Sequence, residues 1–149
     1  MSFDYSTLVR DRTQADVSAR NAKGTYNAED LNRVTAALDD LYSQLTAFGY
    51  VIPGYAAVID REWTDEDVPT QSQMEQYIEN VQAVRGALNV LHTTPQSPQS
   101  MELLNFTKAN DMEQILFDVN ALLNSMASVY LRSGMSWAYS GEANFYFMN

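Results

Sequence analysis

The sequence contains no cysteine, which excludes disulfide bonds, thiolate catalysis and cysteine-based zinc sites. It is also poor in basic residues: 9 lysines and arginines stand against 19 acidic residues, for a formal net charge of −10. Binding to phosphate groups depends on clustered lysine and arginine. The charge balance therefore argues against a nucleic-acid partner and against docking on an anionic membrane.

Long hydrophobic runs are missing too. The longest candidate, YVIPGYAAVI at residues 50–59, contains Pro53 and Gly54 and is shorter than the ~18 residues that suggest a membrane span. The N-terminal stretch MSFDYSTLVRDRTQ has no apolar core of the kind that a signal peptide carries. We therefore expect neither a transmembrane helix nor a secretory leader.

What is present is a helical pattern that repeats three times. The chain has 149 residues and is 46% hydrophobic, which suits one domain with its own core. One apolar stripe follows Asn27, a good N-cap, and stops at Gly49. A second follows the capping box of Thr70 and Gln73, reaches Leu91 and ends at HTTPQSPQS.

The third stripe is the strongest. It begins at Thr107, which we expect to cap it, and ends at Gly134. A shorter helix is expected from Thr13 to about residue 22. Amphipathic helices of this length need one another for stability. The sequence thus predicts a mainly α protein: an antiparallel bundle of three long helices plus a short N-terminal helix. The long connection at residues 50–69 has room for a short strand or hairpin near residues 51–59.

The chain ends on an unusual concentration of rings, in SWAYSGEANFYFMN. Alternating aromatic residues on either side of SGEAN predict a small β-hairpin-like tail, and a lone hairpin needs a surface to lean on. We divide the chain into a helical domain, residues 1–136, and this aromatic segment, residues 137–149. We expect the segment to dock on a neighbouring subunit, although packing on its own bundle is the alternative. The interface residues are predicted to be Trp137, Tyr139, Phe145, Tyr146 and Phe147.

Recognisable catalytic chemistry is scarce. His92 is the single histidine and has no nucleophile or orienting acid in a motif with it, so it is interpreted as a helix-end residue. No catalytic, cofactor-binding or metal-binding residue is predicted. A cell-wall hydrolase is conceivable, but the sequence offers no convincing catalytic constellation for one.

The acidic run IDREWTDEDVP leaves one alternative open. Its carboxylates, on Asp60, Glu62, Asp65, Glu66 and Asp67, surround Trp63. Such a loop is able to hold Ca²⁺ or to lie against a sugar, which would make the chain a host-recognition module. The simpler interpretation is that Trp63 fixes the loop to the bundle and the acids favour the next helix's dipole.

Five blocks of sequence, taken in order, resemble a module of tail-region structural proteins from phages and prophages of Gram-positive bacteria. They are LVRDRTQADV (8–17), KGTYNAEDLNRV (23–34), REWTDEDVPTQSQMEQYIENVQAVRGAL (61–88), ANDMEQILFDVNALLNSM (109–126) and WAYSGEA (137–143). The chain departs from that pattern in a shorter link, SARNAKGT, and in the added residues ANFYFMN. It also consists of the module alone.

The resemblance implies a non-enzymatic structural or adaptor protein of the virion, in the tail, baseplate or fibre attachment. It would be made in the bacterial cytoplasm and assemble with other phage structural proteins. A homo-oligomer in a symmetric assembly is expected, without cofactors, nucleic acid or membrane. The lone module suggests a separately made component, and the added aromatic residues suggest a docking peptide.

Overall fold

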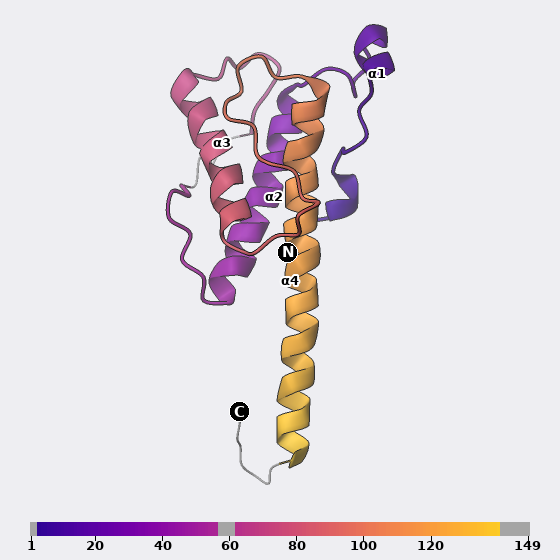
Figure 1. The fold of residues 1–149 in the computed structure, drawn as a ribbon. Helices are drawn as coiled ribbons and strands as arrows, with labels where there is room; N and C mark the ends of the chain where they lie inside the picture. The colour runs from indigo at the N-terminus through magenta and orange to yellow at the C-terminus, as the bar shows by residue number, and fades with distance from the viewer. Residues whose placement is uncertain (1–2, 57–61, 141–149) are drawn as a thin grey trace.

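The computed structural model describes residues 3–56 and 62–140, of which residues 129–140 are described as helical backbone only. The described chain is mainly helical and contains no strand (Figure 1). Its elements are a 3₁₀ turn η1 (Tyr5–Thr7), α1 (Gln14–Ala19), α2 (Ala28–Ala47), α3 (Gln71–Gly86) and α4 (Phe106–Ser140). The predicted set of three long helices and one short N-terminal helix is confirmed. The strand suggested near residues 51–59 is not present at 51–56, and 57–61 lie outside the described residues.

The helix starts follow from local capping. Asn27 accepts a hydrogen bond from the backbone N–H of Asp30, and the Asp30 side chain accepts one from Asn27 N–H, as predicted. Thr70 and Gln73 form the same reciprocal pair at α3. The predicted cap of α4 is wrong by two residues: Asn105 Oδ1, not Thr107, accepts the N–H of Lys108 at 2.8 Å.

The positions where the helices end depend less on local sequence than the positions where they start. Gly49 follows α2 with φ of +92°, the left-handed conformation expected of a helix stop. α3 ends at Gly86 instead of reaching Leu91, which is 64% exposed. The reason is tertiary, because Arg85 donates hydrogen bonds to the carbonyls of Pro95 and Thr94, and so holds the following connection against the end of the helix.

The three long helices run in the same direction, so the predicted antiparallel arrangement is wrong. Arg33, early in α2, bonds Glu113, early in α4, whereas Gln44, late in α2, lies 3.4 Å from Asn120, further along α4. Figure 1 shows α2, α3 and α4 starting at one end of the body. The long connections at 48–70 and 87–105 return the chain to that end. Short loops could only have joined neighbouring helices in an antiparallel arrangement.

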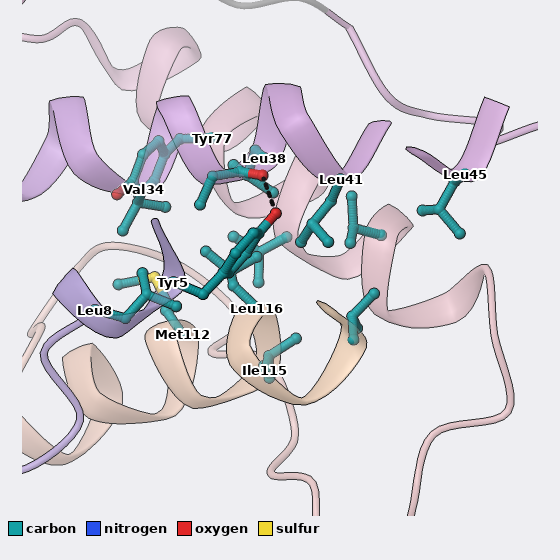
Figure 2. Close-up of a cluster of buried hydrophobic side chains, with 14 of the residues drawn as sticks. Tyr5, Leu8, Val34, Leu38, Leu41, Leu45, Tyr77, Met112, Ile115 and Leu116 are labelled. Atoms are coloured by element: carbon teal, nitrogen blue, oxygen red, sulfur yellow. Dashed lines mark hydrogen bonds between the residues drawn. The ribbon is translucent and has the colours of Figure 1, made fainter. Parts of the chain in front are cut away.

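The core lies where the apolar faces of these helices meet. It is built from Leu31, Val34, Leu38, Leu41 and Leu45 of α2, Tyr77, Ile78, Val81 and Val84 of α3, and Met112, Ile115, Leu116, Val119 and Leu123 of α4. Tyr5 reaches in from η1, between α2 and α4, and donates a hydrogen bond to the Ala37 carbonyl (Figure 2). The same hydroxyl donates to Asp40 Oδ2 at 2.7 Å, which is shorter than the 3.4 Å to the Ala37 carbonyl. Burial of each such large side chain stabilises the fold by roughly 1.5–3 kcal/mol.

α4 extends well past the ends of α2 and α3 (Figure 1). It has 35 residues against 20 in α2, which corresponds to about 52 Å against about 30 Å at ~1.5 Å per residue. Where its side chains are described, up to residue 128, the buried positions of α4 run from Ala109 to Leu123. None of the described helices has the length and apolar character needed to cross a lipid bilayer.

Candidate functional site

The predicted interface residues fall at the far end of α4 or beyond it. Trp137 and Tyr139 lie in the last helical turn, where the sequence had suggested a strand. Gly134 does not end the helix, and the proposed boundary between residues 136 and 137 falls inside continuous helical backbone. Phe145, Tyr146 and Phe147 lie outside the described residues, as does the second half of the predicted hairpin.

Trp63 belongs to the core. Its side chain is 3% exposed, and Asn32 of α2 brackets its backbone, accepting from Trp63 N–H at 2.8 Å and donating to the Trp63 carbonyl at 2.9 Å. The ring therefore fixes the loop to the bundle. A sugar would find no open ring face at this position.

The acids around Trp63 are held apart from one another. Asp67 Oδ2 accepts from the N–H and hydroxyl of Thr64, while Glu62, Asp65 and Glu66 are exposed. Asp60 lies outside the described residues. Within residues 3–56 and 62–140, no three acidic or histidine side chains are grouped so that they could share a metal ion. His92 is exposed in the connection after α3 and not at a helix end.

The most organised polar site is a buried cluster that the sequence did not predict. Glu113 is 0% exposed, and its two carboxylate oxygens accept from Arg33 Nε (2.7 Å), Arg12 Nη2 (2.6 Å) and the backbone N–H of Val9 (2.9 Å). Asp30 Oδ1 also accepts from Arg12 Nη2, at 3.1 Å, and from Arg33 Nη2. We call these four ionised side chains, Arg12, Asp30, Arg33 and Glu113, the buried ion cluster.

The buried ion cluster is electrically balanced. Two guanidinium groups face two carboxylates, so that the large cost of removing each charge from water is offset by its partners. Burial alone lowers the pKa of Arg33, but the hydrogen bonds and charges of Glu113 and Asp30 outweigh it and raise that pKa above its ordinary value. Arg33 therefore stays charged at every physiological pH.

Asn110 completes this site by holding the backbone of Arg12. Its amide group accepts from Arg12 N–H and donates to the Arg12 carbonyl, both at 3.0 Å. The segment before α1 is thereby fastened to the first turns of α4. Such an arrangement joins segments far apart in the sequence. Each charged group of the cluster pairs with at least one other, although Arg12 Nε is buried without a hydrogen-bond partner.

One signal for Glu113 was present in the sequence. It follows Ala109 by four residues and precedes Leu116 by three, so helical spacing places it on the apolar face. Asp30 combines its place in the cluster with a capping role at the start of α2. The cluster draws on three of the sequence blocks given above: residues 8–17, 23–34 and 109–126.

The comparisons with known proteins do not assign the chain to a family. Neither protein-family models, nor curated proteins, nor solved structures gave a match to the chain.

Proposed function

We propose that this chain is a non-enzymatic structural or adaptor protein of a phage particle, in the tail, baseplate or fibre attachment. In this proposal the protein is made in the host cytoplasm and joins other structural proteins through the end of α4. The support from sequence is the resemblance of five ordered blocks. The support from structure is that three of those blocks meet in the buried ion cluster, which holds the body together.

One observation carries the proposal: α4 projects beyond the packed body and bears Trp137 and Tyr139 in its last turn (Figure 1). Tryptophan and tyrosine are the residues most enriched among those that dominate binding energy at protein interfaces. A helical backbone is more rigid than a loose peptide, so less conformational entropy is lost when it binds. The arrangement suits a protein whose role is to be inserted into an assembly.

The experiment compares virions assembled with the full chain and with a chain that ends at Ser136. We expect the shortened protein to be absent from purified particles, while circular dichroism still reports a largely helical body. The matched control is Leu103→Ala, which removes an apolar side chain that is 89% exposed on the body, away from the end of α4. Normal incorporation of the shortened chain would show that the docking proposal is wrong.

The alternative of a Ca²⁺- or carbohydrate-binding module has weaker support, because Trp63 is buried. It remains testable through the exposed Asp65 and its neighbour Asp67. A rise in melting temperature with Ca²⁺ that disappears in Asp65→Asn and Asp67→Asn would favour it. An unchanged melting temperature would count against it.

A further inference from the structure

A groove runs along α3 from its start to Gln82, against the connection that leads to α4. Its volume is about 600 Å³. Ile78, which is 2% exposed, forms its floor together with the half-buried Met74 and Met101. The groove therefore has an apolar floor, and most of its other lining residues are polar. It forms where the chain returns toward the start of α4.

Three carboxylates line this groove and give it a negative charge. They belong to Glu75, Glu79 and Glu102, all exposed, and the lining includes no lysine or arginine. Glu75 accepts a hydrogen bond from Gln71 at 2.9 Å, but none of the three pairs with a cation in the described part of the chain. They are also not among any group placed to share a metal ion there. The charges suit an elongated segment that carries positive charge between apolar side chains.

The far half of α4 has this composition. Between residues 119 and 140 the sequence contains a single charged residue, Arg132. Helical spacing places Val129, Met135 and Tyr139 on the same side as Arg132, together with the small residues Ser128 and Ser136. From residue 129 to residue 139 this face covers about 15 Å of helix at ~1.5 Å per residue. This length is close to that of the groove, which extends along α3 from Gln71 to Gln82.

One chain cannot bring these two surfaces together. The groove lies at the end of the body where the helices begin, and the far half of α4 extends from the opposite end (Figure 1). A contact between them therefore joins two copies of the chain. It uses different surfaces on each copy, which generates rings or filaments instead of a closed pair.

We propose that the groove on α3 binds the far half of α4 from a second copy, with Arg132 facing Glu75 and Glu79. The neighbouring apolar residues of that helix then cover Met74 and Met101. This inference rests on the proposed function, because it takes the end of α4 as the element that assembles. It adds the receiving surface and identifies the partner as the same chain.

The test is the mass of the full chain in solution, by light scattering after size exclusion over a range of concentrations. The wild type is expected to form an oligomer. Glu75→Lys with Glu79→Lys, and separately Arg132→Glu, should each raise the dissociation constant roughly tenfold or more. Mixing the two variants should restore assembly, because each reversed groove then meets a reversed helix. Circular dichroism checks that every variant is folded.

The matched control is Asp65→Lys with Glu66→Lys, which changes the net charge equally on exposed positions outside the groove. It should assemble as the wild type does. A wild type that is monomeric at every concentration, or a mixture that fails to assemble, would overturn the inference.

The two proposals fail in different ways. If the oligomer survives the reversed charges but dissociates when the chain is truncated after Ser136, the groove is not the receiving surface. Docking by the end of α4 would still stand. If the truncated chain enters virions normally, the proposed function fails whatever the oligomeric state is.

Discussion

Glu113 links α4 both to α2 and to the segment before α1, and it does so with no exposure to water. Replacing it by glutamine leaves Arg12 and Arg33 to share the single carboxylate of Asp30. An uncompensated buried charge is expensive, so Glu113→Gln should lower the free energy of unfolding by about 3–5 kcal/mol. Urea denaturation measures this change.

The control for Glu113→Gln is an ion pair at the surface. Lys23 and Asp11 lie 3.0 Å apart, with side chains 40% and 77% exposed. Asp11→Asn should change the free energy of unfolding by less than about 1 kcal/mol. Equal effects of the two substitutions would contradict a special role for burial at Glu113.

Buried tyrosines make stability depend on alkaline pH. Burial raises the pKa of Tyr5, Tyr26 and Tyr77 above the ordinary value, and the carboxylate of Asp40 adds to the effect at Tyr5. In the unfolded chain these hydroxyls ionise near pH ~10, whereas in the folded chain they stay protonated. Above that pH the unfolded state releases protons that the folded state keeps, so stability falls as pH rises.

The measurement for this pH dependence is the urea midpoint between about pH 8 and about pH 11. We expect a level response up to about pH 10 and a decline beyond it, with tyrosinate absorbance rising as the protein unfolds. Tyr5→Phe should make the decline shallower because it removes one of the groups. A midpoint that is constant over the whole range would contradict the assignment.

At the scale of elements, Gly134 in α4 gives a clear test. A glycine inside a helix costs about 0.5–1 kcal/mol relative to alanine. Because the backbone is helical through Ser140, Gly134→Ala should increase helicity by circular dichroism. Lower helicity in Gly134→Ala would instead favour a helix that stops there.

Gly49→Ala is the opposite case. With φ of +92° an added side chain is strained, and the free energy of unfolding should fall by about 1 kcal/mol.

The same elements show what local sequence determines. The starts of α2 and α3 and the stop at Gly49 were predicted, because capping depends on residues within a single turn. The early end of α3 was not, because it depends on Arg85 meeting a connection about ten residues further on. The start of α4 was displaced because both Asn105 and Thr107 are good capping residues and only one is used.

For the whole molecule, the packed body should not depend on the far half of α4. The buried positions described in α4 end at Leu123, with Met126 half-buried after it. A chain that ends at Ser128 should therefore keep its free energy of unfolding within about 0.5 kcal/mol of the full chain, compared at concentrations where both are monomeric.

A chain that ends at Asn120 provides the comparison for that truncation. It loses the fully buried Leu123, and we expect a decrease of about 2–5 kcal/mol in the free energy of unfolding. Denaturation of both truncated chains in urea measures the difference. A large loss already at Ser128 would mean that later residues pack on the body.

The apolar pattern of the sequence could not predict whether neighbouring helices run parallel or antiparallel. Apolar stripes determine which faces meet, but they are the same for parallel and antiparallel neighbours. The length of the connection at 48–70 was the available signal, because a long connection leaves room for the chain to return to the end where the preceding helix began. Of the site, Trp63 as a loop anchor was predicted. The buried ion cluster was missed because it joins three separate segments: Arg12 lies 18 residues from Asp30 and 101 residues from Glu113. Docking by the aromatic segment stays a prediction.

The parallel arrangement of the helices also gives the body a net dipole along the helix axes. Each helix carries roughly half a positive charge at its start and half a negative charge at its end, and here the three long helices add where antiparallel neighbours would cancel. Glu29 and Asp30 in the first turn of α2 offset part of the positive end. The two ends of the body therefore differ in sign before any side chain at the far end of α4 is counted. Copies that associate end to end lower their energy by pointing the same way, so polarity along an assembly is already built into the backbone of each subunit.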